Sequence, residues 1–179
     1  NEIIEDVKKN GGQAILTSNR HKTGTDRIYE ALGKINKSNI ELVMNLQGDE
    51  PMINVQDIKH LHENMIKKKS ELGTLAAHIK DKKLYENPNV VKVITKNSLD
   101  DTVFPEAVKF SRKLNLIDKN IYHHLGIYCY QYKILKKFVG FKQSQNEIKH
   151  KLEQLRALDN DISINVALAK ESPIGVDTN

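Results

Sequence analysis

Helix-type and strand-type segments alternate along the sequence, and this alternation limits its fold more than any other feature. Apolar residues recur with helical spacing at 2–9, from about 25, and at 55–68, 132–138 and 146–158. Short apolar runs predict strands at 14–17, 41–46, 73–79, 90–95, 108–112, 123–130 and 162–169. We therefore expect an α/β domain with a mostly parallel, Rossmann-like sheet flanked by helices. The denser strand signals between residues 73 and 130 predict a small mixed or antiparallel addition.

The composition is that of a soluble, globular chain. Of the 179 residues, 39% are hydrophobic and 28% are charged, and no apolar run is long enough to span a membrane. No signal peptide is visible, so we expect a cytoplasmic protein with a single domain over residues 1–179. The lone cysteine, Cys129, excludes an internal disulfide and is more typical of a core residue than of a nucleophile.

The net charge of +5 does not predict nucleic-acid binding. The lysines at 67–69 follow an amphipathic helical pattern, where cations suit the helix C-terminus, and no aromatic residues are interleaved with the lysine runs. The chain has only four arginines, Arg20, Arg27, Arg112 and Arg156. Because arginine offers carboxylates and phosphates a planar fork that lysine lacks, these positions are candidates for specific recognition.

The stretch QGDEP, residues 47–51, follows one of the predicted strands. In open α/β sheets, ligands gather beyond the carboxyl ends of the strands. Gly48 lets a ligand approach the backbone, and Asp49 can give a carboxylate to Mg²⁺. The same residues also fit a plain turn capped by Pro51, with both acids in solvent. The stretch by itself leaves both interpretations open.

The stretch RHKTGTDRI, residues 20–28, places Gly24 and Thr25 at a predicted helix start, with Arg27 in the first turn. Helix N-termini bind anions through free backbone N–H groups, and a nearby arginine strengthens such binding. Threonine, glycine and aspartate are also all favoured in an ordinary helix cap. Both interpretations stay open here as well.

The predicted strand HHLGIYCY, residues 123–130, separates two kinds of side chain on its two faces. Leu125, Ile127 and Cys129 point one way, whereas His124, Gly126, Tyr128 and Tyr130 point the other. A face of this second kind suits a hydroxyl-rich ligand, and it would equally suit the exposed face of an edge strand.

Two further stretches carry polar residues next to predicted elements. In LEQLR, Glu153, Gln154 and Arg156 flank the apolar stripe of the predicted helix 146–158, as polar residues on many helices do. In GVDT, Asp177 follows the last predicted strand, where a helix N-cap would stand.

Together these stretches resemble one enzyme family. TGTDR, QGDEP, FSR, HHLGIYCY, LEQLR and GVDT occur in the order and at roughly the spacing of the bacterial 3-deoxy-manno-octulosonate cytidylyltransferases, the CMP-Kdo synthetases. The resemblance runs from about residue 3 to the end, and QGDEP and HLGIY are specific to this family among sugar nucleotidyltransferases. It implies a nucleotide-diphospho-sugar-transferase-like α/β fold. It also implies conversion of CTP and the acid sugar Kdo to CMP-Kdo and pyrophosphate for lipopolysaccharide biosynthesis.

The resemblance implies a role for several residues. It implies a Mg²⁺ ion held by Asp49 and Asp177, with Arg112 completing the catalytic set and gripping the Kdo carboxylate. The implied nucleotide contacts are Thr25, Arg27, Gln47 and Gly48, and the implied sugar contacts are Arg112, His124, Tyr128, Glu153 and Gln154. The family commonly forms homodimers, which implies a dimerisation and sugar-binding strand insertion at about 96–132. Glu50 receives no role.

The sequence also departs from the family pattern. The family begins with a strand and loop, resembling IPAR and GKPL, that supply an arginine and a lysine to the triphosphate. Here residue 3 already aligns with a later helix. Lys113 stands where the family has an IP turn, His150 replaces an expected acid, and the chain stops at Asn179, where a terminal helix should begin. We therefore expect a truncated domain that lacks the N-terminal strand and loop, and whose parent is the enzyme.

Two alternatives to the Kdo enzyme remain open. The chain fits a cytidylyltransferase for another acid sugar, such as a sialic acid, because side-chain spacing does not fix the sugar. It also fits an inactive remnant that keeps the fold as a nucleotide-binding module. The missing front loop favours the remnant, whereas the presence of both Asp49 and Asp177 favours the enzyme.

Overall fold

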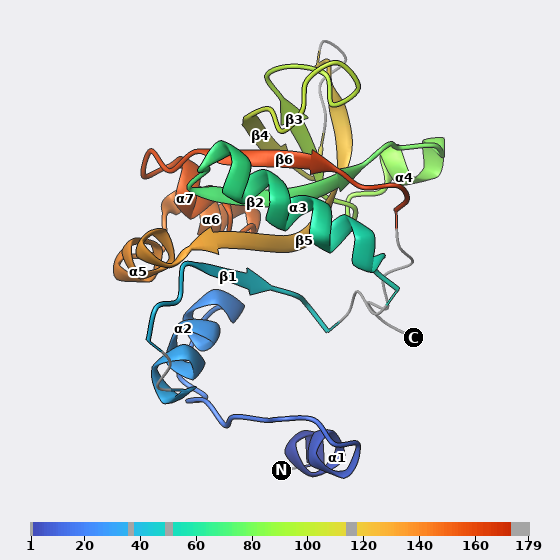
Figure 1. Ribbon diagram of the computed structural model, residues 1–179. Coiled ribbons are helices and arrows are strands. Elements are labelled where there is room, and N and C mark those ends of the chain that lie inside the picture. Colours follow the sequence, from blue (N-terminus) through green and yellow to red (C-terminus); the bar gives the residue numbers. More distant parts are fainter. Residues whose placement is uncertain (1, 36–37, 49–51, 114–117, 173–179) are drawn as a thin grey trace. The chain divides into compact units, whose positions relative to one another are not determined.

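The computed structural model describes residues 2–35, 38–48, 52–113 and 118–172 (Figure 1). The chain forms two compact units, Asn1–Ile40 and Glu41–Asn179. Within the described residues, no helix is both long enough and apolar enough to cross a membrane.

The first unit contains two helices, α1 (Glu2–Lys9) and α2 (Gly24–Ile35). Helix α2 begins where the sequence predicts, because Thr23 caps its first turn. The Thr23 hydroxyl donates to an Asp26 carboxylate oxygen (2.9 Å) and accepts the Asp26 N–H (3.4 Å). This arrangement occupies a backbone donor that a helix start otherwise leaves without a partner.

The strand predicted at 14–17 is wrong, because residues 12–18 have no regular secondary structure. Side chains of α2 bind this segment instead. Lys34 Nζ donates to the Leu16 carbonyl (2.8 Å), and Arg27 Nη1 donates to Thr17 Oγ1 (2.7 Å) and to the carbonyl of residue 18 (3.0 Å). The described part of the first unit offers no second strand, so the apolar run has no ladder to join.

The second unit is built on a sheet that has six strands in the part of the chain that the structure describes. The strands are β1 (Leu42–Asn45), β2 (Leu72–Ala77), β3 (Lys92–Thr95), β4 (Ala107–Ser111), β5 (Ile121–Gln131) and β6 (Ile164–Leu168). Their order is β4-β3-β5-β2-β6, with β1 also paired to β5. The apolar runs predicted each of these strands to within a few residues.

Strand β5 is long enough to pair with three other strands. Strand β2 runs along one edge of β5, and β3 and β1 share the other edge at its two ends. The pairing of β2 with β6 is parallel, whereas the other pairings between these strands are antiparallel. Strands β1, β2, β3 and β6 therefore run in one direction. The predicted α/β fold with a helix-flanked sheet is confirmed. The sheet is mixed, however, because β5 runs against its neighbours from inside the sheet and is not a small addition to mostly parallel strands.

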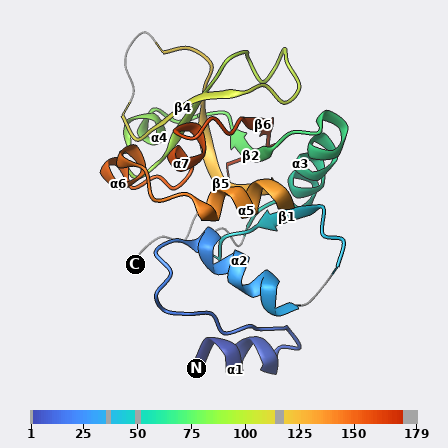
Figure 2. The same cartoon turned by 90° about the vertical axis from the view of Figure 1, so that its left-hand side faces the viewer.

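Helix α3 (Val55–Lys68) covers one face of the sheet, as Figures 1 and 2 show. Its bounds match the predicted helix, and the Asn54 side chain caps it by accepting the Gln56 N–H. Leu61 and Met65 enter a core formed by the apolar residues of β2, β5 and β6. Helix α3 approaches β2 so closely at Gly73 that an added Cβ would lie 2.7 Å from Met65 Sδ. Only glycine leaves room for this packing.

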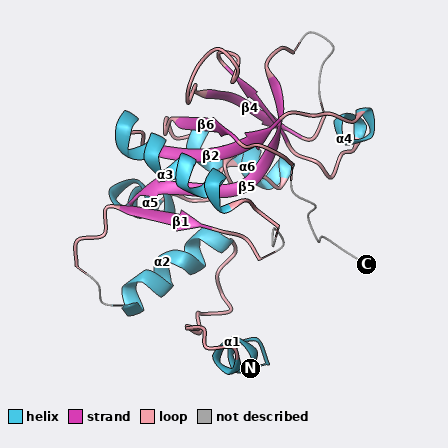
Figure 3. Cartoon of the chain, turned by 45° about the vertical axis from the view of Figure 1, so that its right-hand side comes forward, coloured by secondary structure: helices cyan, strands magenta, loops and turns pink. Residues whose placement is uncertain are grey.

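Helices cover the opposite face as well (Figure 3). They are α5 (Tyr132–Gly140), α6 (Gln145–His150) and α7 (Leu155–Leu158), while the short α4 (Lys82–Glu86) links β2 to β3. Helix α5 follows β5 directly and buries Ile134, Leu135 and Phe138. The sheet thus has an apolar layer on both sides, which explains why its strands read as continuous apolar runs.

The single helix predicted over 146–158 is wrong, because the chain breaks it into α6 and α7. Lys151 adopts a left-handed conformation (φ 53°) at the end of α6, and its N–H donates to the Glu147 carbonyl. Arg156 then folds back on Glu147 in a bidentate pair, with Nε–Oε2 at 2.8 Å and Nη2–Oε1 at 2.6 Å. Burial is the largest influence on Glu147 and would raise its pKa. The hydrogen bonds from Arg156, Gln143 and Ser144, together with the Arg156 charge, outweigh burial, and the pKa is lowered.

Removing Arg156 should therefore destabilise the second unit strongly. The change Arg156→Met leaves the buried Glu147 carboxylate without its bidentate partner, and we expect a loss of about 3–5 kcal/mol in the free energy of unfolding. Urea denaturation measures this loss. The double variant Glu147→Gln/Arg156→Met is the control and should lose less, because it leaves no buried charge. Equal losses in the single and double variants would contradict the explanation.

Candidate active site

The two faces of β5 separate as the sequence predicts. Leu125, Ile127 and Cys129 lie in the core under α3. His124 and Tyr128 lie on the other face and are also buried, so the alternative of an exposed edge strand is wrong. The face that carries His124, Gly126 and Tyr128 is therefore a buried polar surface inside the sheet.

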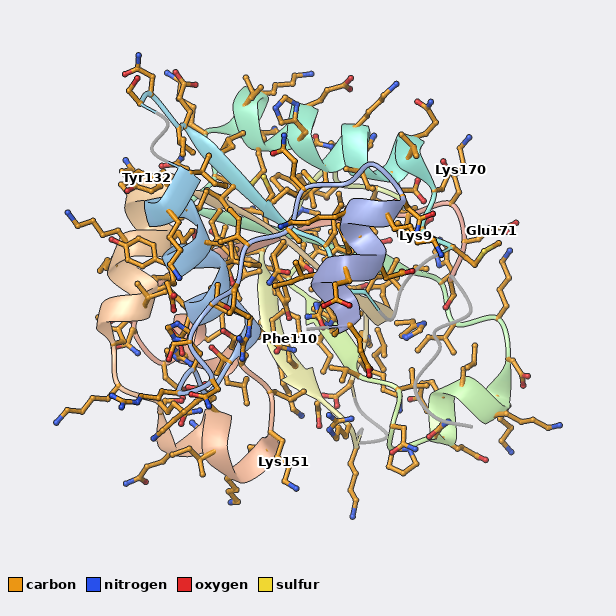
Figure 4. The ribbon with its side chains drawn as sticks, turned by 90° about the horizontal axis from the view of Figure 1, so that it is seen from below. Lys9, Phe110, Tyr132, Lys151, Lys170 and Glu171 are labelled. Carbon is orange, nitrogen blue, oxygen red and sulfur yellow. The ribbon has the colours of Figure 1, made fainter. Side chains whose placement is uncertain are left out.

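Aromatic rings form a continuous row along this face, which we call the aromatic column. Neighbouring ring centroids are 5.0–6.1 Å apart, and the members in order are Phe110, His124, Tyr128, Tyr130 and Phe138. Phe110, labelled in Figure 4, stands at one end of the column. Tilted and edge-to-face pairs at such distances stabilise a fold beyond the area that they bury. The column fixes the positions of His124 and Tyr128.

His124 is held in one neutral form. The Thr74 hydroxyl lies 2.7 Å from the Ile127 carbonyl, to which it donates, and 3.0 Å from His124 Nε2. Since the hydroxyl proton goes to the carbonyl, His124 Nε2 carries a proton and donates to Thr74 Oγ1. Burial, together with the nearby His123, lowers the pKa of His124 to about 3. His124 therefore stays uncharged at neutral pH.

Tyr128 lies near the turn between α6 and α7. Burial raises the pKa of Tyr128 well above its usual value, and the neighbouring Tyr130 and Glu153 raise it further. Gln154, next along the turn, is also buried. The Glu147–Arg156 pair holds this turn, and Arg156 in addition stacks on Phe138 at 4.6 Å from the ring centroid. Three predicted sugar contacts, Tyr128, Glu153 and Gln154, thus belong to one neighbourhood.

Gln47 reaches the same face of β5 from the end of β1. The β1–β5 register places Asn45 opposite Tyr128, so that Gln47 lies farther along toward Gly126. An added Cβ at Gly126 would lie 3.5 Å from Gln47 Nε2, which shows that the exposed Gln47 side chain lies over this glycine. Gly48 follows and is exposed. Asp49, like Asp177, lies outside the described residues.

Arg112 stands just beyond β4, two residues after Phe110. Phe110 lies in the aromatic column near the end of β4, and Arg112 follows this strand in a bend. Its Nη1 donates to the carbonyls of Pro88 (3.3 Å) and Asn89 (3.1 Å), and its side chain is partly exposed. The guanidinium group therefore keeps donors for a ligand at the rim of the face.

The two remaining predicted nucleotide contacts, Thr25 and Arg27, belong to the first unit. Thr25 is buried in the first turn of α2, and Arg27 binds the preceding loop. The predicted helix start is confirmed. Among the described residues, no group of three histidine, cysteine, aspartate or glutamate side chains could hold a metal ion. Asp49 and Asp177 stay a predicted metal pair.

Sequence reasoning missed Thr74 and Lys92. Thr74 fixes the proton position on His124, and Lys92 is fully buried at the start of β3. The one available signal was Lys92 itself, a lysine inside the buried-type run VVKVIT. Thr74 gives no such signal, because threonine is common in strands.

Proteins of known name are similar to this chain over nearly its whole length. The sequence model described as Cytidylyltransferase matches residues 1–164. The 3-deoxy-manno-octulosonate cytidylyltransferase of Thermodesulfovibrio yellowstonii is 41% identical, over 98% of this chain and 73% of its own length. The protein of the same name in Bartonella tribocorum is 38% identical, over 99% of this chain and 73% of its own length. This chain belongs to the 3-deoxy-manno-octulosonate cytidylyltransferase family.

Solved structures agree with this membership. The structure of CMP:2-keto-3-deoxy-manno-octonic acid synthetase complexed with CTP matches with a TM-score of 0.83 and 32% identity, over 99% of this chain and 72% of that one. A 4-diphosphocytidyl-2C-methyl-D-erythritol synthase from Anaerococcus prevotii, at 18% identity and a TM-score of 0.53, shares the fold alone. The cytidylyltransferase resemblance drawn from the motifs is confirmed, and the chain is a nucleotidyltransferase by family.

The neutral state of His124 makes the stability of this cytidylyltransferase depend on pH. The unfolded chain takes up a proton at His124 near pH 6.5, whereas the folded chain does so only near pH 3, so stability falls as the pH drops below 6.5. Between about pH 7.5 and about pH 5, wild type should lose about 2 kcal/mol more than His124→Gln. Urea denaturation at both pH values measures the difference. Equal losses would show that His124 does not titrate in this way.

Proposed function

We propose that this chain is a cytidylyltransferase for Kdo, which converts CTP and 3-deoxy-D-manno-octulosonate to CMP-Kdo and pyrophosphate for lipopolysaccharide biosynthesis. The observation that carries the proposal is 38–41% identity, across nearly the whole chain, to relatives named for this reaction. The similar structure complexed with CTP supports the choice of nucleotide. The buried polar face of β5 supports a hydroxyl-rich second substrate.

In this reaction a Kdo hydroxyl oxygen attacks the α-phosphorus of CTP. A new P–O bond forms while the bond from the α-phosphorus to the oxygen bridging to the β-phosphate breaks, pyrophosphate leaves, and the hydroxyl proton passes to solvent. Such a transfer depends on alignment and on neutralising phosphate charge, more than on covalent help from the protein. The residues of this chain therefore act by binding and orienting the two substrates.

Asp49 and Asp177 would hold Mg²⁺. Asp49 follows β1 and Asp177 follows β6, and these strands run in the same direction, so both chain segments leave the sheet at the same edge. Carboxylate oxygens are donors that Mg²⁺ favours, and the ion keeps other positions for water and phosphate oxygens. When bound, the ion would neutralise charge on the triphosphate.

The sugar would lie against the face of β5. Arg112 would bind the Kdo carboxylate with its planar fork, since its guanidinium stands at the rim of this face. Glu153 and Gln154 would bind sugar hydroxyls from the α6–α7 turn, with His124 and Tyr128 lining the site behind them. Because His124 is neutral and fixed by Thr74, it orients a ligand without adding charge.

Four residues would contact the nucleotide: Gln47, Gly48, Thr25 and Arg27. Gln47 and Gly48 would lie against it at the end of β1, where the exposed Gly48 leaves the backbone accessible. Thr25 and Arg27 would contribute from the start of α2. Arg27 is anchored to the loop before it through Nη1, and its guanidinium group has further donors for an anion.

We also propose a cytoplasmic homodimer formed through the strand insertion at about 96–132. Strand β4 ends the strand order of the sheet, and two apolar side chains in this insertion, Val103 and Val108, are exposed by about 60%. Exposed apolar side chains at the last strand of the described sheet are typical of a surface that another chain covers.

A pyrophosphate-release assay tests the proposed reaction. The full chain is mixed with CTP, Mg²⁺ and Kdo, and in parallel with a sialic acid in place of Kdo. We expect release with Kdo that disappears in Asp49→Ala, because half of the metal pair is lost. Release with sialic acid alone would make the chain a cytidylyltransferase for a different acid sugar. CTP binding without release from either sugar would indicate a non-catalytic nucleotide-binding module.

The role of Arg112 has a separate test. Arg112→Lys keeps the positive charge but loses the planar fork, so the KM for Kdo should rise by about tenfold or more while the KM for CTP changes little. Arg20→Lys is the matched control, because Arg20 is an exposed arginine of the first unit. An unchanged KM for Kdo in Arg112→Lys would remove Arg112 from the sugar site.

A further inference from the structure

Lys92 is a buried cation for which the mechanism above gives no role. It is the first residue of β3, and its side chain has no exposed surface. Its ammonium group donates to two backbone carbonyls, those of Asn87 (2.5 Å) and Arg112 (3.2 Å). Lysine is almost never fully buried unless it is paired, so this position needs an explanation.

No acidic side chain pairs with Lys92 among the residues that the structure describes. Its neighbours are cationic or become so on protonation. Burial lowers the pKa of Lys92, and the Arg112 charge lowers it further. His123 is opposite Lys92 in the β3–β5 register, and burial together with Lys92 lowers the pKa of His123. The described surroundings therefore concentrate positive charge around the Lys92 ammonium.

Lys92 and Arg112 act on the same turn. Arg112 donates to the carbonyls of Pro88 and Asn89, and Lys92 donates to Asn87 in that turn and to the backbone of Arg112 itself. The ammonium of Lys92 thus ties the end of β4 to the 87–89 turn from inside the protein. The backbone from which the Arg112 fork extends is fixed as a result.

We propose that Lys92 is a positioning residue for the carboxylate of the acid sugar. It holds the Arg112 backbone and, from the side of the sheet that carries His123, adds a second, buried positive charge behind Arg112, so that the Arg112 site favours a carboxylate over a neutral sugar. Lys92 and Arg112 are both positive, and no described acidic side chain pairs with Lys92. An anion bound by Arg112 would offset these charges. The proposal rests on the proposed function, because it takes Arg112 as the carboxylate-binding residue.

The test measures Kdo binding directly and does not need turnover. The full chain, with CMP and Mg²⁺ present, is titrated with Kdo in a calorimeter, and CTP affinity is measured separately. Lys92→Met removes the charge and the donors, whereas Lys92→Gln keeps amide donors for the carbonyls and guards against a variant that fails to fold. Lys96→Met is the matched control, an exposed lysine just beyond the other end of β3.

We expect Lys92→Met and Lys92→Gln to weaken Kdo binding by about tenfold, the loss of one charge-assisted contact, with CTP affinity within about twofold of wild type. Lys96→Met should bind Kdo like wild type. In an Arg112→Gln background the Lys92 changes should have much less effect, because Lys92 acts through Arg112. If Lys92 had a purely structural role, its substitution would weaken the binding of Kdo and CTP alike. The effects of the Lys92 and Arg112 substitutions on Kdo affinity would then be additive.

Three results would overturn the proposal: unchanged Kdo affinity in both Lys92 variants, equal losses for Kdo and CTP, or no Kdo binding by wild type. Failure of the proposed function has a different signature. It would be seen as Lys92-dependent Kdo binding in a protein that releases no pyrophosphate from CTP and Kdo.

Discussion

The hydrogen-bond ladders along β5 are the constraint on which the second unit depends. This strand pairs with β2 on one edge and with both β1 and β3 on the other, so three separate chain segments take their register from it. A shift of one residue in β5 would exchange its two faces and move His124 and Tyr128 into the layer under α3. The position of each candidate sugar contact on β5 therefore follows from the same register that forms the core.

Because β5 is internal, its polar face had to be stabilised by packing and by hydrogen bonds. The aromatic column supplies the packing from Phe110 to Phe138, and Thr74 satisfies His124. Buried polar groups with satisfied partners are rigid and cost little, whereas the same groups without partners would be destabilising. The Glu147–Arg156 pair extends this rigidity to the α6–α7 turn. A ligand at the rim would meet side chains that already have fixed positions.

The sequence predicted the elements better than their connections. Alternating residues in HHLGIYCY separated the two faces of β5 correctly, because period-two patterns depend only on local geometry. The strand at 14–17 failed since an apolar run becomes a strand only beside a partner, and Lys34 and Arg27 bind that run instead. The helix over 146–158 failed because the helical spacing continues through Lys151, where the left-handed turn depends on the tertiary Glu147–Arg156 pair. For the site, the motifs predicted Arg112 and Gln47, whereas Thr74 gave no signal and Lys92 gave only its place inside an apolar run.

Three side chains of β5, those of His124, Tyr128 and Cys129, have pKa values far from neutral pH. Burial brings the pKa of His124 to about 3 and that of Cys129 to about 11, and it raises the pKa of Tyr128 well above its usual value. A general base works best when its pKa lies near the working pH, so none of these three groups suits that task. His124 and Tyr128 suit a face that binds by shape and by neutral hydrogen bonds, while Arg112 carries formal charge beside it. In the proposed phosphoryl transfer, where alignment and charge neutralisation dominate, such a division would let this face hold the sugar without competing for its protons.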